Sequence, residues 1–110
     1  MQLIPKLDVH THTIVSGHAY STMQEMAREA AERGLEILGI TEHAPGIPGT
    51  CDPIYFRNLH VVPREMYGVR LVLGAELNIL DKDGTLDLDE YYYRMLDLRI
   101  AGIHSLCWKG

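Results

Sequence analysis

The chain has 110 residues, of which 46% are hydrophobic and 23% charged, as expected for one small soluble globular domain over residues 1–110. A net charge of −5 argues against a nucleic-acid partner and against binding to an anionic membrane. No apolar run is long enough to span a bilayer and the first residues lack signal-peptide features, so a cytoplasmic location is expected.

The first predicted element is a short buried strand over residues 3–9. Residues i and i+2 of a strand point to the same side, so His10 and His12 should project together from its end, a geometry that suits one metal ion. Asp8 is placed to accept a hydrogen bond from a ring and fix its tautomer, and His18 follows on the next loop. Taken alone, the His-x-His pattern is equally typical of two surface histidines.

A helix is predicted next. Ser21 and Thr22 open it with overlapping capping signals, and Gly34 ends it. A second buried strand is predicted over residues 37–41, followed by a loop rich in Pro and Gly over residues 45–53. The apolar stripe of the helix consists of Met23, Met26, Ala27, Ala30 and Ala31.

The second half of the chain predicts two further strands. The third strand runs from residue 69 through residue 79, and residues 83–84 are the turn of a short hairpin excursion. Residues 91–96 predict a helix of two turns, and residues 98–103 predict the fourth strand. Residues 55–62 fit neither period.

Strands that alternate with helices, each an almost unbroken apolar run, predict an α/β fold with a parallel sheet covered on both faces. Each predicted strand is followed by residue types that bind metals, at the edge where such sheets and barrels build their sites. A purely structural role is easy to state for each residue alone, but their occurrence at four strand ends favours one shared site. The residues are His10 and His12, Glu42 and His43, Glu76, and His104.

Imidazole and carboxylate ligands without thiolate suit zinc, manganese or iron. The candidates exceed the needs of one tetrahedral ion, so two or three ions are expected, with Glu76 as the bridging carboxylate. Clustered ions activate water and clamp a displacement at phosphorus, which predicts hydrolysis of a small phosphate ester. Arg64 is a candidate for holding the phosphate, although a surface arginine is the simpler interpretation. The candidate ligands are His10, His12, His18, His43, Glu76 and His104.

Five motifs that occur in order resemble the PHP (polymerase and histidinol phosphatase) superfamily, and within it the YcdX-like metal-dependent phosphatases. They are residues 8–13, 16–21, 40–43, 74–79 and 101–104. The resemblance implies a distorted seven-stranded β/α barrel with a trinuclear, usually zinc, site.

By the same resemblance, His10 and His12 bind one ion and Glu76 bridges to a second ion that also takes His104. The third ion would be held by His18 and His43. Glu42 stands where the family often has aspartate, which is expected to matter little, and His60 matches no ligand position.

Members of that superfamily are more than twice this length, and their later part supplies further ligands. The chain is therefore interpreted as the N-terminal half of a PHP protein, an incomplete barrel whose open edge predicts a homo-oligomer. Two alternatives stay open. One is a non-catalytic metal-binding fragment, and the other is an amidohydrolase-type carbon–nitrogen hydrolase, against which Glu76 counts because many such enzymes carry a lysine there.

Overall fold

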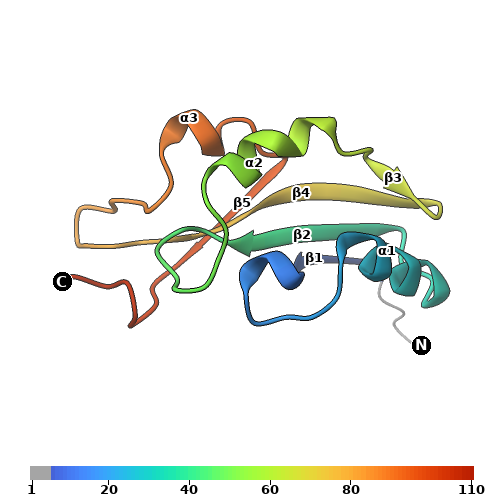
Figure 1. The fold of residues 1–110 in the computed structure, drawn as a ribbon, viewed down its shortest axis with the longest axis horizontal. Helices are drawn as coiled ribbons and strands as arrows, with labels where there is room; N and C mark the ends of the chain where they lie inside the picture. Colours follow the sequence, from blue (N-terminus) through green and yellow to red (C-terminus); the bar gives the residue numbers. More distant parts are fainter. Residues whose placement is uncertain (1–5) are drawn as a thin grey trace.

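A curled sheet organises the chain in the computed structural model, which describes residues 6–110 (Figure 1). Its strand order is β1-β2-β4-β3, and β5 also pairs with β4. All pairs are parallel except that of β3 with β4. The α/β fold and the partial β/α barrel are thus confirmed, since the parallel sheet curls into a half-barrel. The strands are β1 (Leu7–Thr11), β2 (Ile37–His43), β3 (Glu65–Met66), β4 (Val69–Asn78) and β5 (Leu98–Gly102).

The helices are short, apart from α1. Two of them are single turns of 3-10 helix, and α3 makes one turn where two were predicted. None of the helices within residues 6–110 has the length and apolar character needed to cross a membrane. The helices are η1 (Ile14–Ser16), α1 (Met23–Glu32), α2 (Ile54–Asn58), η2 (Leu59–Val61) and α3 (Glu90–Tyr93).

Helix α1 forms as its sequence predicts. Thr22 caps it, and the Thr22 side chain and Glu25 exchange hydrogen bonds with each other's backbone N–H groups. Ala27 and Ala30 are buried on its apolar stripe. Gly34 takes the left-handed conformation just after the helix, at φ 79°.

The main core lies on one face of the two central strands. Leu38 and Ile40 of β2 and Leu71 and Leu73 of β4 are register partners, and they pack with buried residues of α1 and α2, including Phe56. The opposite face, reached by the alternation of the strands, carries small and polar residues such as Thr41, Gly74 and Glu76. The two central strands are therefore covered on both faces as predicted, but their second face is small and polar rather than apolar.

The two outer parallel strands are more exposed than predicted. Leu7 of β1 is 53% exposed, and residues of β5 alternate between half-buried and exposed. Each strand has a paired neighbour on one side only within residues 6–110, which leaves its other side open to water. The predicted burial of the first strand is wrong for its described part, and residues 3–5 of that prediction lie outside the described residues.

Two hairpins flank β4. The predicted one is confirmed by a bridge between Ile79 and Leu86, with Gly84 in the turn at φ 80°. The other joins β3 to β4 and has no counterpart among the predictions. Tyr67 and Gly68 both have positive φ, which is the two-residue turn that matches strand twist.

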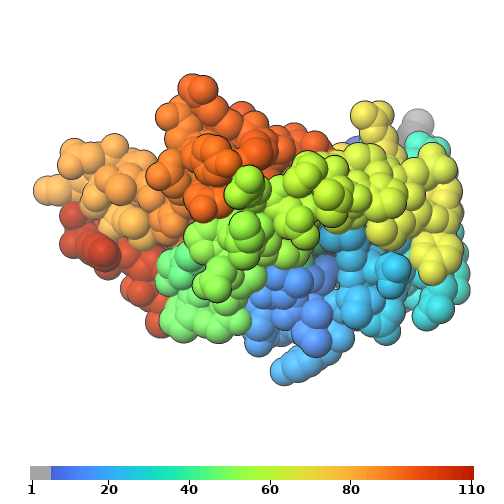
Figure 2. Space-filling model, turned by 45° about the horizontal axis from the view of Figure 1, so that its top comes forward, coloured from blue at the N-terminus to red at the C-terminus, as the bar shows by residue number. Residues whose placement is uncertain are grey.

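The loops at the carboxyl ends of the strands lie against one another. Figure 2 shows the segment after β2, in green, between the blue amino-terminal region and the orange segment around α3. Gly17 packs so closely on Gly49 that an added Cβ would lie 2.2 Å from its carbonyl oxygen. On the other side, the Gly46 N–H donates to Asp87 at 2.7 Å. These contacts assemble the loops around the strand ends.

Candidate metal centre

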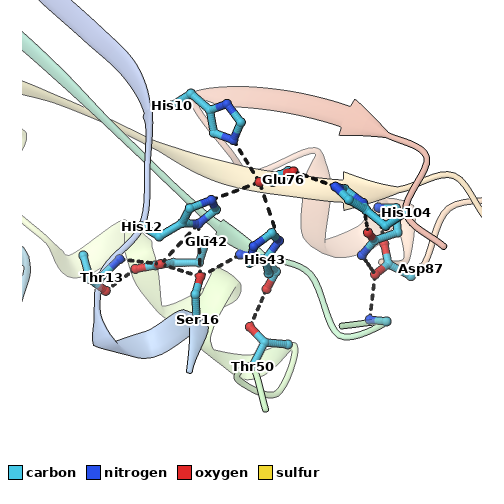
Figure 3. A network of polar contacts seen from close by, with 12 residues as sticks. His10, His12, Thr13, Ser16, Glu42, His43, Thr50, Glu76, Asp87 and His104 are labelled. Atoms are coloured by element: carbon cyan, nitrogen blue, oxygen red, sulfur yellow. Dashed lines mark hydrogen bonds and ion pairs between the residues drawn. The ribbon is translucent and has the colours of Figure 1, made fainter. Parts of the chain in front are cut away.

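The carboxylate of Glu76 is the centre of a cluster of histidines (Figure 3). Its Oε1 lies 2.8 Å from His10 Nε2, 3.0 Å from His12 Nε2 and 3.5 Å from His43 Nδ1. Its Oε2 lies 3.1 Å from His104 Nε2. Four imidazoles from three different strand regions thus converge on one side chain that is 9% exposed.

The sheet register explains this convergence. His43 and Glu76 are direct partners in the parallel pairing of β2 with β4, so their side chains leave the same face. His10 and His12 are two residues apart at the end of β1 and reach the same oxygen, as predicted. His104 follows β5, which pairs with β4 on its other side. Parallel strands bring these residues together because their carboxyl ends share one edge.

His18 belongs to the same cluster. Its ring centroid lies 4.7 Å from that of His43 and 5.4 Å from that of His12, while the His12 and His43 rings stack at 4.2 Å. The turn that carries His18 depends on Gly17, whose φ is 86° and whose missing side chain admits Gly49. All five predicted histidines and Glu76 are therefore in one place.

Burial favours the neutral form of two of these rings. Desolvation lowers the pKa of His12 below its usual value, against the opposing effect of Glu76 and Glu42. Desolvation also lowers the pKa of His43, and the neighbouring His12 ring lowers it further. Burial alone would raise the pKa of Glu76, but the hydrogen bond from His10 and the surrounding rings leave it lowered. Neutral imidazoles around an ionised carboxylate are the protonation states that metal binding requires.

The donor set fits a divalent transition metal. His10, His12 and Glu76 each offer one ligand atom, and these atoms lie within 4.8 Å of one another. His43 Nδ1 is buried and has no hydrogen-bond partner among the described residues, although it faces the cluster. A buried polar atom without a partner is costly, and a metal ion would satisfy it.

Arg64 lies at the other end of the sheet. Its guanidinium donates to Asp97 at 2.7 Å and to two backbone carbonyls, and its own carbonyl accepts from Leu71 N–H. Glu76 lies five positions after Leu71 along the strand, or about 16 Å away. The structure therefore does not bring Arg64 to the cluster, because the β3–β4 hairpin places it at the amino-terminal end of the strand.

Two other residues lie outside the cluster in different ways. Asp8 accepts the backbone N–H of His10 at 3.2 Å rather than a ring N–H, so its predicted role in fixing a tautomer is wrong. His60 is exposed on η2, and its Nδ1 lies 2.8 Å from the Arg57 carbonyl oxygen. This agrees with the absence of His60 from the predicted ligands.

Glu42 has a larger place in the site than the sequence indicated. Its side chain is completely buried and accepts hydrogen bonds from Thr13 N–H, Thr13 Oγ1 and Ser16 Oγ. Ser16 Oγ in turn lies 3.2 Å from His12 Nδ1. Glu42 thereby ties the η1 turn to β2, a role that needs the fold to bring residues 26 to 29 positions apart together.

A matching arrangement adjoins His104. Asn78, also fully buried, lies with its Oδ1 2.5 Å from His104 Nδ1 and donates from Nδ2 to Asp87 at 2.6 Å. Asp87 also accepts the backbone N–H groups of Asn78 and Gly46. Asn78 was detectable in the sequence, since it lies two residues after Glu76 and so shares its face of the strand.

Comparisons with known proteins agree with this geometry. The sequence model of the PHP domain matches residues 8–107. A protein of Acetivibrio thermocellus named as a probable phosphatase is 50% identical over 101 residues, which cover 92% of this chain and 42% of that protein.

A relative of the same name from Thermoanaerobacter pseudethanolicus is 48% identical over 103 residues, covering 94% of this chain and 42% of the relative. A third, from Caldanaerobacter subterraneus, is 47% identical over 109 residues, which cover 99% of this chain and 43% of that protein. This chain spans less than half the length of these relatives. The match over residues 8–107 shows that the chain belongs to the PHP domain family.

Proposed function

We propose that this chain carries metal ligands of a phosphoesterase that hydrolyses a small phosphate ester. The observation that carries the proposal is the convergence of four histidine nitrogens on Glu76 at 2.8 to 3.5 Å. The names of the relatives supply the reaction class, since those proteins are called probable phosphatases.

Within this proposal, His10, His12 and Glu76 hold one ion, since their ligand atoms already form a group. Glu76 Oε2 and His104 serve a second ion, and His18 with His43 serve a third. Zinc is the first candidate because the resemblance to the PHP superfamily implies it, and manganese or iron suit the same donor set. Bound divalent ions would supply positive charge for the phosphoryl oxygens and activate water.

The chain's own contribution is to hold these groups in place. Glu76 is fixed on a strand that pairs on both sides, and both of its oxygens face imidazoles. Arg64 is engaged with Asp97 far from the cluster, so the proposal leaves phosphate binding to the metal centre. Burial lowers the pKa of His12 and of His43, which favours the neutral rings that bind a metal ion.

Elemental analysis and a phosphatase assay test the proposal. Protein purified without chelator should contain at least about one zinc, manganese or iron ion per chain. With zinc or manganese added, it should release phosphate from p-nitrophenyl phosphate, and Glu76→Gln should not. Protein that takes up no metal would contradict the metal site. Metal-loaded protein that cleaves p-nitroacetanilide but no phosphate ester would instead indicate a carbon–nitrogen hydrolase, and metal without either activity a binding fragment.

We further propose that copies of this chain associate in solution through the exposed outer strands. On one side of β1 and one side of β5, no strand among the described residues pairs with the backbone N–H and C=O groups. Unpaired strand edges of this kind recruit other chains. Light scattering should give a dimer or a larger assembly with phosphatase activity below that of a full-length relative. A monomer as active as that relative would contradict this expectation.

A further inference from the structure

We propose that two carboxyl groups beside the cluster, those of Glu42 and Asp87, set the ring tautomers of His12 and His104. Each acts through one intermediate side chain, Ser16 in the first case and Asn78 in the second. The inference rests on the proposed metal site, because its consequence is that each ring offers Nε2 to an ion. Glu42 and Asp87 are thus positioning residues that touch neither metal nor substrate.

The hydroxyl of Ser16 has a single hydrogen and two acceptor positions. Its hydrogen goes to Glu42 Oε1 at 2.8 Å, since that carboxylate only accepts. One acceptor position takes the backbone N–H of His43 at 2.9 Å. The second acceptor position of the hydroxyl therefore faces His12 Nδ1, at 3.2 Å. His12 must therefore carry its proton on Nδ1.

The same accounting applies to Asn78. Its Nδ2 donates to Asp87 Oδ2 at 2.6 Å, which fixes the orientation of the amide and turns Oδ1 toward His104. An amide oxygen only accepts, so His104 Nδ1, at 2.5 Å, must be the donor. Asp87 is itself held by the N–H groups of Asn78 and Gly46, so the amide cannot flip without losing a buried hydrogen bond.

Both assignments direct Nε2 of the ring at Glu76, at 3.0 Å from His12 and 3.1 Å from His104. With Nδ1 protonated, a neutral ring presents a lone pair to an oxygen that is also an acceptor. That contact is favourable only with a cation between the two atoms or a second proton on the ring. Without the two carboxyl groups, each ring could move its proton to Nε2 and bond Glu76 directly, which would compete with metal.

The test is nitrogen NMR of the histidine rings, which shows which ring nitrogen carries a proton. In wild-type protein, with or without zinc, His12 and His104 should show a protonated Nδ1. Asp87→Ala removes the carboxylate that accepts from Asn78 Nδ2, so the orientation of the Asn78 amide is no longer fixed. His104 should then populate the Nε2-protonated tautomer, and zinc affinity should fall by about 10- to 100-fold.

The matched control is Asp97→Ala, because Asp97, just before β5, likewise accepts a backbone N–H of β4, that of Leu73, but contacts no residue of the cluster. It should change neither the tautomers nor the zinc affinity. If Asp87→Ala does not fold, Ser16→Ala provides the second test, since it removes the acceptor for His12 Nδ1 together with the link to Glu42 and the acceptor for the His43 N–H. His12 should then populate the Nε2-protonated form while His104 stays unchanged.

The inference is overturned if wild-type His12 or His104 is protonated on Nε2 alone. It is also overturned if Asp87→Ala leaves the His104 proton wholly on Nδ1. Where that variant does not fold, a His12 proton that stays wholly on Nδ1 in Ser16→Ala overturns it. These outcomes are separate from the proposed function. If wild-type protein shows the expected tautomers but binds no zinc, the metal site is contradicted and the positioning roles of Glu42 and Asp87 remain. If zinc binds to rings that carry the opposite tautomer, the positioning roles are contradicted and the metal site remains.

Discussion

The two ends of the parallel sheet hold charged groups in opposite ways. At the amino-terminal end, Arg64 and Asp97 form an ion pair at 2.7 Å. At the carboxyl end, the single carboxylate of Glu76 faces four imidazoles, and His43 Nδ1 has no hydrogen-bond partner in the described part of the chain. The pair is complete in itself, whereas the cluster has more donors than its one carboxylate can use.

The pKa directions show the same contrast. Burial alone would raise the pKa of Asp97, but the Leu73 N–H and the Arg64 guanidinium lower it, so a fixed positive group stabilises the carboxylate. The pKa of Glu76 is also lowered, yet it depends on hydrogen bonds and charge from imidazoles, while burial favours the neutral form of two of them. Glu76 is thus surrounded by imidazoles, which can gain or lose a proton, whereas Asp97 is paired with a guanidinium whose charge is permanent. The first arrangement is typical of a ligand cluster and the second of a structural ion pair.

The largest expected effect comes from removing the shared carboxylate. Glu76→Gln keeps the shape of the side chain but takes away the charge on which four rings converge. Zinc affinity, measured by competition with a chromophoric chelator, should fall by more than about 100-fold, since even partners of ligands contribute 10- to 100-fold. Unchanged zinc affinity would mean that the carboxyl end of the sheet does not bind metal through Glu76, and so does not differ from the amino-terminal end in this way.

A histidine pair sharpens the comparison within the chain. His12→Ala removes a ring from the cluster, whereas His60→Ala removes an exposed ring that bonds only the Arg57 carbonyl. The first should lower zinc affinity by about 10- to 100-fold or more, and the second should leave metal content as in the wild type. If His60→Ala strips the metal and His12→Ala does not, the assignment of the cluster is wrong.

The smallest effect is expected at the amino-terminal end. Arg64→Ala removes a partly exposed ion pair and two hydrogen bonds to carbonyls. The free energy of unfolding in urea should fall by about 1 kcal/mol, because exposed pairs contribute little. Metal content should not change, and a loss of metal would place Arg64 in the function of the site after all.

The sequence predicted the elements whose signals are local. The Thr22–Glu25 capping box, the turn at Gly84 and the apolar face of β4 each depend on neighbours in the chain, and each is present. The exposure of β1 and β5 was missed, because burial of an outer strand depends on what lies beside it rather than on its own residues. The short β3 strand has too few residues to show a period.

The candidate site divides in the same way. The histidines and Glu76 were predictable because each lies at the carboxyl end of a strand and such ends meet. Two of the supporting groups were not predictable, because Asp87 lies in a hairpin and Ser16 in a 3-10 turn, where no period indicates their partners. Arg64 was proposed to hold the phosphate because a guanidinium suits that group. Residue chemistry of this kind does not indicate at which end of the sheet a loop residue lies.

The register between β2 and β4 has a consequence for how this sequence can change. Glu76 pairs with His43 through an unbroken ladder that begins at Ile37 and Arg70. Deleting or inserting a single residue within either strand would turn Glu76 toward the core face or misalign it with His43. Length variation among related sequences, and any engineered insertion, should therefore be confined to loops such as residues 45–53, while within the two strands only substitutions would be tolerated.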